Sequence, residues 1–358
     1  MNKRNNYKTL LRSLAWTAAL LLLASSWPQL KMRIGALALD AHAAALQIPV
    51  QIPVKKKPDE SKEIPQVGGK KTVNVNLVRL YVTVRDKHGA IVTGLQKNDF
   101  RVYEDGVEQK IAFFSKDMTD PLTIAMMIDT SGSQEDFLDA EKATAWRFLK
   151  DILQKNDLAT VISFDTTVNM LADFTDYKPA LHAAIDKAEI NAPVVSADSP
   201  VDPPGTVLYD AINQVCKYQL PQETGRKALI ILTDAEDEGS TSTLRSAIYA
   251  AQKANAVIHV LLIANPSMYW MSGMGYIGGE VAHEMAYQTG GRVISIRNNR
   301  DLDKAFTELA QELRSQYVIA YYPTNTAENG AFRKVKVETT QKGLKVLTRA
   351  GYYAPTGP

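Results

Sequence analysis

The chain has 358 residues, with 41 Lys and Arg against 39 Asp and Glu and a formal net charge of +2. This length is enough for two or three domains, each with a hydrophobic core of its own. The single cysteine, Cys216, excludes an internal disulfide, and its helical setting predicts a buried core residue. The balanced charge gives no basic footprint, so we expect no nucleic-acid partner.

The first residues have the layout of an export signal. A basic start is followed by an apolar run from Leu14 to Trp27 and later by the small-x-small pattern Ala41-His42-Ala43. The apolar run is short for a membrane span. We therefore expect residues 1–43 to be a signal peptide, with an uncleaved inner-membrane anchor as the alternative. Either segment predicts an exported protein, periplasmic or secreted, whose only membrane contact would be this anchor.

Residues 44–71 are rich in proline and lysine, which favours an extended linker. The pattern then changes to alternating apolar residues, typical of strands. Further strand candidates at 100–104 and 110–114 are separated by Asp105-Gly106, a strong hairpin signal. We predict a small, mostly antiparallel β unit over residues 72–118.

Between residues 119 and 315, short apolar runs alternate with longer amphipathic segments. This pattern predicts an α/β domain with a doubly wound, mainly parallel sheet. The predicted strands are 122–128, 159–164, 228–232, 257–263 and 292–296, with a short edge strand at 169–172. The predicted helices lie near 135–154, 177–189, 207–219, 242–254, 279–289 and 301–314. Ligands of such sheets bind where the strands end.

The β pattern returns in the C-terminal segment, 316–358. Its strand candidates are 316–322, 333–338 and 344–349, with turns at Asn329-Gly330 and Lys342-Gly343. These strands have too little core to be stable alone. We expect them to pack with residues 72–118, so that one β module is built from both flanks of the α/β domain.

Oxygen-bearing side chains gather where the predicted strands end. Asp129 ends an apolar run, and Ser131 and Ser133 follow it in a tight turn. Thr206 and Asp234 belong to two further segments expected at the same edge. Hydroxyl and carboxylate oxygens suit Mg²⁺, or alternatively Ca²⁺ or Mn²⁺, rather than zinc. Taken singly, each of these residues is also explained as a helix cap or a turn residue.

Together the three segments resemble the von Willebrand factor A domain and its metal-ion-dependent adhesion site, within a Rossmann-like α/β fold. The resemblance implies direct metal contacts from Ser131, Ser133 and Thr206. It implies that Asp129 and Asp234 act largely through water. Neutral hydroxyls leave part of the cation's charge uncompensated, so an acidic side chain of a partner protein can complete its shell.

The flanking segments extend the resemblance and also limit it. Residues 95–114, 313–323 and 350–354 resemble the von Willebrand factor A-related proteins abundant in Acidobacteria, which implies an exported architecture. Such sites often have glycine after the second aspartate, whereas this chain has Ala235 and then the acidic rim Glu236, Asp237 and Glu238. The rim would favour Ca²⁺ and repel an acidic ligand; a solvated loop is the alternative.

These features predict an exported, metal-dependent protein-binding module and no enzymatic activity. The alternative is a structural envelope protein whose metal only stabilises the fold. A hydrolase is the least favoured interpretation, because the chain has no Gly-x-Ser-x-Gly elbow and its five histidines form no zinc-binding pattern.

Overall fold

A computed structural model describes residues 77–116, 120–191, 205–263 and 277–357. The chain divides into two compact units, 1–70 and 71–358, and every described residue belongs to the second. The predicted signal peptide or anchor (1–43) and the predicted linker (44–71) lie outside the described residues. Within the described residues, no helix is long and apolar enough to cross a membrane.

Six strands form the central sheet, in the order β10-β9-β8-β5-β6-β7. All neighbours run parallel except β7, which is antiparallel to β6 at the edge. The strands are β5 Leu122–Asp129, β6 Leu158–Phe164, β7 Val168–Thr175, β8 Arg226–Thr233, β9 Ala256–Ile263 and β10 Val293–Ile296. The predicted α/β class with a mainly parallel sheet is thus confirmed, and each predicted strand is present.

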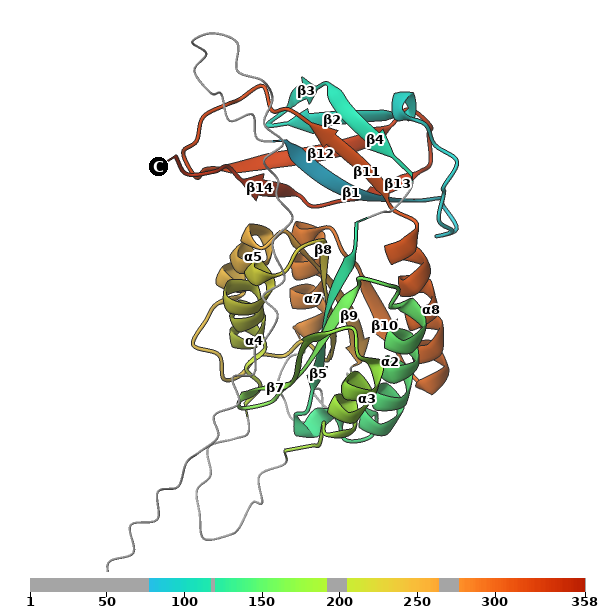
Figure 1. Ribbon diagram of the computed structural model, residues 1–358, viewed down its shortest axis with the longest axis vertical. Helices are drawn as coiled ribbons and strands as arrows, with labels where there is room; N and C mark the ends of the chain where they lie inside the picture. Colours follow the sequence, from blue (N-terminus) through green and yellow to red (C-terminus); the bar gives the residue numbers. More distant parts are fainter. Residues whose placement is uncertain (1–76, 117–119, 192–204, 264–276, 358) are drawn as a thin grey trace, which may run out of the picture. The chain divides into compact units, whose positions relative to one another are not determined.

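Helices cover both faces of this sheet (Figure 1). One face carries α2 Leu138–Ile152, α3 Lys178–Asp186 and α8 Asn299–Arg314. The other carries α4 Leu208–Gln214, α5 Leu244–Lys253 and α7 Gly278–Thr289. In β5, Met126 and Ile128 pack into the first core and Ala125 and Met127 into the second, because successive side chains of a strand point to opposite faces. Burial on both faces explains why this strand is a continuous apolar run.

The helix predicted at 207–219 is α-helical only to Gln214. It continues as a π-helical turn, Val215–Gln219, and a 3-10 turn, Leu220–Gln222. Cys216 lies in the π-helical turn and is buried, as predicted. Burial raises the pKa of its thiol to about 12, so the thiol stays neutral.

Strands from the two flanks pair in two four-stranded sheets, β13-β1-β11-β4 and β14-β12-β2-β3. The N-terminal flank supplies β1 Val78–Arg85, the 3-10 turn Lys97–Asp99, β2 Phe100–Glu104, β3 Val107–Gln109 and β4 Ile111–Ser115. The C-terminal flank supplies β11 Tyr317–Tyr321, β12 Phe332–Thr339, β13 Lys345–Leu347 and β14 Gly351–Tyr353. Each sheet therefore contains strands from both flanks, and both sheets contribute to one core, which includes Leu80, Phe100 and Tyr321.

The hairpin expected at Asp105-Gly106 has a different second strand from the predicted one. The turn is present, with φ of 48° and 84°, the positive values that a two-residue hairpin turn requires. It joins β2 to the short strand β3. The predicted partner, 110–114, instead forms β4 in the other sheet, where it pairs with β11. Strand β11 lies some two hundred residues away from β4 along the chain, so no local pattern could identify this pairing.

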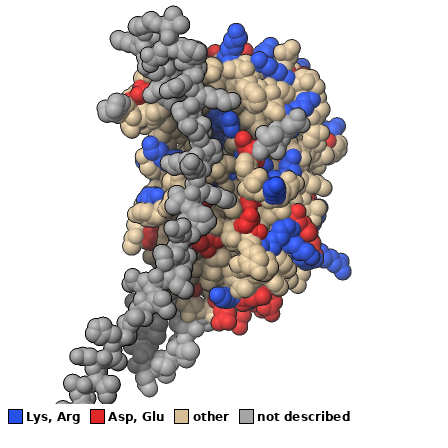
Figure 2. Space-filling view, viewed as in Figure 1, with Lys and Arg blue, Asp and Glu red and all other residues tan. Residues whose placement is uncertain are grey.

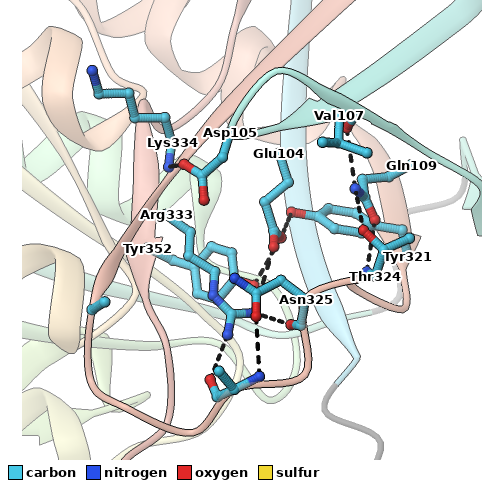
Figure 3. A network of polar contacts seen from close by, with 12 residues as sticks. Glu104, Asp105, Val107, Gln109, Tyr321, Thr324, Asn325, Arg333, Lys334 and Tyr352 are labelled. Carbon is cyan, nitrogen blue, oxygen red and sulfur yellow. Dashed lines mark hydrogen bonds and ion pairs between the residues drawn. The ribbon is translucent and has the colours of Figure 1, made fainter.

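A buried ion pair links the strands β2 and β12 (Figure 3). Glu104 Oε1 and Arg333 Nη1 are 3.4 Å apart, with side-chain exposures of 2% and 4%. The hydroxyls of Tyr321 and Tyr352 donate to Glu104 Oε2 at 2.8 and 2.9 Å. Arg333 also donates to the carbonyl oxygen of Asn325. Each buried charge thus has several hydrogen-bond partners, which a buried ion pair requires.

Candidate functional site

Three neighbouring parallel strands, β8, β5 and β6, each carry an aspartate at their carboxyl end. Asp129 is the last residue of β5, whereas Asp165 and Asp234 directly follow β6 and β8. Their exposures are 0%, 4% and 2%. Adjacent parallel strands end at the same edge of a sheet, so the topology brings three buried carboxyl groups to one edge.

Four of the five predicted ligands form one hydrogen-bonded cluster. The hydroxyl oxygens of Ser131 and Ser133 are 3.1 Å apart, and Ser133 Oγ donates to Asp234 Oδ2 at 2.6 Å. Asp129 Oδ1 accepts a hydrogen bond from the amide of Ser131 at 3.0 Å. Ser133 is exposed, whereas both aspartates are buried. The cluster therefore runs from buried carboxyl groups to a hydroxyl that faces solvent.

The fifth predicted ligand, Thr206, lies in the loop before α4. It is 7% exposed, and its carbonyl oxygen accepts hydrogen bonds from the amides of Glu238 and Gly239 at 3.1 and 3.2 Å. These bonds tie the Thr206 loop to the loop that follows Asp234. The backbone thus holds Thr206 next to the segment that carries another predicted ligand.

Asp165 belongs to the same edge and was not predicted. Its carboxyl group accepts hydrogen bonds from Thr130 Oγ1 at 2.9 Å and from the amide of Thr167 at 3.0 Å. Its carbonyl oxygen accepts from the amide of Val207 at 2.7 Å. Asp165 thereby joins the turn after β5 to the Thr206 loop. The rule that singled out Asp129 and Asp234, an acid at the end of a buried parallel strand, also applies to it.

Burial and a neighbouring charge together raise the pKa of Asp129. Burial is the main cause that raises its pKa to about 7, and the charge of Asp234 adds to the increase. Hydrogen bonds from Ser131 and from Thr233, whose Oγ1 lies 2.6 Å from Asp129 Oδ2, act in the opposite direction. A cation held between the two aspartates would offset their repulsion and stabilise the ionised carboxylates.

Ala235 has a backbone conformation that usually belongs to glycine. Its φ is +62°, and its methyl group is fully buried in the core on the α5 and α7 face. Its amide donates to Thr233 Oγ1 at 2.9 Å, and the next amide, of Glu236, donates to Asp234 Oδ1 at 3.1 Å. The alanine therefore adopts a tight turn of the kind that glycine forms with less strain, and the turn aims two amides at Thr233 and Asp234.

The acidic rim is partly used to hold neighbouring elements. Glu236 Oε1 accepts a hydrogen bond from the amide of Gly278, at the start of α7, at 2.8 Å. Asp237 accepts from the amide of Tyr209, in the first turn of α4, at 2.9 Å. Both side chains are half-buried, whereas Glu238 is exposed. Two of the three acids thus act as structural acceptors at helix starts, and Glu238 alone fits a solvated loop.

Acidic side chains also gather on the surface near this edge. Figure 2 shows Asp and Glu concentrated at the lower end of the view, the end at which the parallel strands of Figure 1 terminate. Glu135, Asp136 and Asp139, which follow the Ser133 turn, are exposed. Such a surface attracts cations, and it would disfavour an acidic ligand that the cation does not neutralise.

The donor set fits a hard cation only if the hydroxyls take part. Among the described residues, no group of three or more His, Cys, Asp or Glu is arranged to hold a metal ion. A cation at this edge would therefore need the hydroxyl oxygens of Ser131, Ser133 and Thr206 in addition to the carboxylates. A set made of oxygen alone is the type that Mg²⁺, Ca²⁺ and Mn²⁺ prefer.

No family model matches the chain, and no curated protein matches it. Several solved structures are similar to part of it. The conserved hypothetical protein BatB from Bacteroides thetaiotaomicron is 19% identical, with 54% of this chain and 100% of that chain covered, at a TM-score of 0.42. A von Willebrand factor type A protein from Catenulispora acidiphila is 14% identical, with 79% and 75% covered, at a TM-score of 0.44.

A third similar structure is proximal thread matrix protein 1 from the mussel byssus, solved with zinc in its metal-ion-dependent adhesion site (MIDAS) motif. It is 16% identical, with 59% of this chain and 49% of that chain covered, at a TM-score of 0.45. These similarities concern the fold alone. The candidate site therefore stands on its own residues and on the order of the sheet.

Proposed function

We propose that this protein binds a divalent cation at the carboxyl edge of its central sheet and uses the cation to bind a partner protein. The cluster of Asp129, Ser131, Ser133 and Asp234 is the observation that carries this proposal. It places buried carboxyl groups behind hydroxyls that reach solvent. Mg²⁺ is the preferred ion, and Ca²⁺ and Mn²⁺ are the alternatives, because the donors are all oxygens.

The same arrangement supports binding rather than catalysis. Ser131, Ser133 and Thr206 would contact the ion, and Asp129 and Asp234 would act through water. An ion held mainly by neutral groups keeps part of its positive charge, so an acidic side chain of a partner would complete its shell. Part of the acidic rim is already engaged with α4 and α7, which reduces its competition with such a ligand. We further propose export of the protein and no enzymatic activity.

Calorimetric titration of the metal-free full chain with Mg²⁺, Mn²⁺ and Ca²⁺ tests the cation site. We expect the wild type to bind and the double variant Ser131→Ala/Ser133→Ala to bind at least about tenfold more weakly, because two direct ligands are lost. The matched control is Ser295→Ala, an exposed serine in the edge strand β10 of the same sheet. A wild type that releases no binding heat, or a double variant that binds equally well, would refute the site.

Affinity capture from native envelope extracts tests the partner. We expect proteins captured with Mg²⁺ to be lost with a chelator and with Asp129→Ala. Crosslinking mass spectrometry should place them at the carboxyl edge of the central sheet, near Ser133. If the cation raises the unfolding temperature but no captured protein depends on it, the metal has only a structural role and the binding function is wrong.

A further inference from the structure

A buried carboxyl group lies on the first turn of α2, directly after the Ser131 to Ser133 turn. Glu141 is 0% exposed, and its amide donates to the carbonyl oxygen of Phe137 at 2.9 Å. Neither of its carboxyl oxygens has a hydrogen-bond partner in the described part of the chain. Burying a carboxyl group without hydrogen-bond partners is strongly unfavourable, so this position requires an explanation.

The helix face that carries Glu141 packs against the central sheet, and α2 begins shortly after β5 ends, so its first turn lies near the carboxyl edge of the sheet. Leu138 and Ala145, three residues before and four after it, share this face because of the helical period. Both belong to the core that contains Ile128 and Leu232, which lie immediately before the last residues of β5 and β8. Burial first, and then the charges of Asp129 and Asp234, raise the pKa of Glu141, so its carboxyl group is within electrostatic range of both aspartates.

A second acceptor near the site also has no donor. Gln134 is 1% exposed, and its Nε2 donates to Ser133 Oγ at 3.1 Å and to the carbonyl oxygen of Ile263 at 3.4 Å. Its Oε1 has no partner among the described residues. Two buried side chains around the cluster thus carry acceptor oxygens that receive no hydrogen bond from the described residues. Water bound to a cation is a strong donor, because the ion polarises its O–H bonds.

We propose that Glu141 is a positioning residue of the cation site, whose carboxylate accepts a hydrogen bond from water bound to the ion. This role rests on the proposed metal-dependent function. Contact through water agrees with the absence, among the described residues, of three acidic groups arranged to ligate one ion. The carboxylate would both orient that water and add a negative charge on the buried side of the ion, while the hydroxyls stay toward the solvent side.

Calorimetric titration of the full chain with Mg²⁺ and Mn²⁺ compares the wild type with Glu141→Gln and Glu141→Leu. We expect a ten- to hundredfold loss of affinity in both, the usual effect of removing a partner of the bound ligands. In metal-free buffer, we expect Glu141→Leu to unfold at the same temperature or higher, because an apolar side chain replaces an unsatisfied carboxyl group. The control is Asp139→Asn, an exposed acid on the same turn, with affinity within about twofold of the wild type.

Several results would overturn this role. Equal affinity in the wild type and both Glu141 variants would show that Glu141 is only a core residue, and an equal loss in Asp139→Asn would show a general effect of charge. If Glu141→Gln does not fold, Glu141→Leu decides the question, because it also lacks the carboxylate. A wild type that binds no cation would overturn the site and this role together. Binding that needs Ser131 and Ser133 but not Glu141 would overturn this role alone.

Discussion

The carboxyl group of Asp129 makes the stability of the metal-free protein depend on pH. Its pKa is about 7 in the folded protein, mainly because of burial and then because of Asp234. In an unfolded chain an aspartate has a pKa of about 3.9. Between these values the folded state holds a proton that the unfolded state has released. The contribution of this group to the free energy of unfolding is therefore greatest below about pH 4 and decreases as the pH rises to about 7.

We predict that Asp129→Asn removes this dependence. In metal-free buffer, the free energy of unfolding of the wild type, measured relative to the variant, should fall between about pH 4 and 7 and level off above. Urea unfolding at several pH values measures it, and Asp139→Asn, on the exposed face of α2, serves as the reference. Parallel pH profiles for the wild type and Asp129→Asn would contradict the prediction.

Residues at the site differ in how far the sequence could reveal them. Asp129 and Asp234 stand at the ends of apolar runs, so their place at the sheet edge follows from the pattern. Glu141 could not be found in this way, because an acid in the first turn of a helix is usually an exposed residue that complements the helix dipole. Only its packing against the sheet shows that it is buried.

At the scale of elements, β2 and β12 depend on the ion pair of Glu104 and Arg333. We predict that Arg333→Leu lowers the free energy of unfolding by about 3–5 kcal/mol, because the Glu104 carboxylate then remains buried without its counter-charge. Replacing both residues by leucine should recover part of this loss, since no charge is left buried. Urea unfolding measures both variants.

The control for this experiment is an exposed ion pair on the same strand. Lys336 Nζ and Glu338 Oε1 are 2.5 Å apart, with side-chain exposures of 71% and 45%. Lys336→Ala should leave the urea midpoint unchanged, because water screens exposed pairs. An Arg333→Leu variant as stable as Lys336→Ala would show that the buried pair is dispensable.

At the scale of the whole molecule, the α/β part is inserted within a β module that neither flank completes alone. In the sheet β13-β1-β11-β4, the C-terminal strand β11 lies between the two N-terminal strands. The antiparallel register places Ser115 of β4 opposite Val318 of β11. The chain therefore leaves the module and re-enters it at adjacent positions of one strand pair.

This topology predicts which fragments fold. Residues 72–118 alone should be unfolded, with poorly dispersed amide resonances, because β1 and β4 lack the strand between them. Joining 77–116 to 317–357 through an Asn-Gly turn should give a folded module, because a two-residue turn placed there keeps Ser115 opposite Val318 and makes the junction an ordinary hairpin. The excised 119–315 domain, whose six-stranded sheet is complete, should keep its helical circular dichroism. A folded 72–118 fragment would show that the flanks are independent.

The elements of the α/β domain and the oxygen-rich turn after β5 follow from the local sequence pattern alone. Side-chain periodicity, apolar runs and turn residues are properties of short segments, so they can be read locally. By contrast, the folded chain alone shows that β4 pairs with β11, that Asp165 joins two loops of the site, and that Glu141 is buried. These features depend on contacts between distant segments, as Ser133 and Asp234, 101 positions apart, illustrate. No local pattern encodes such contacts, because burial and pairing are set by the packing of the whole chain.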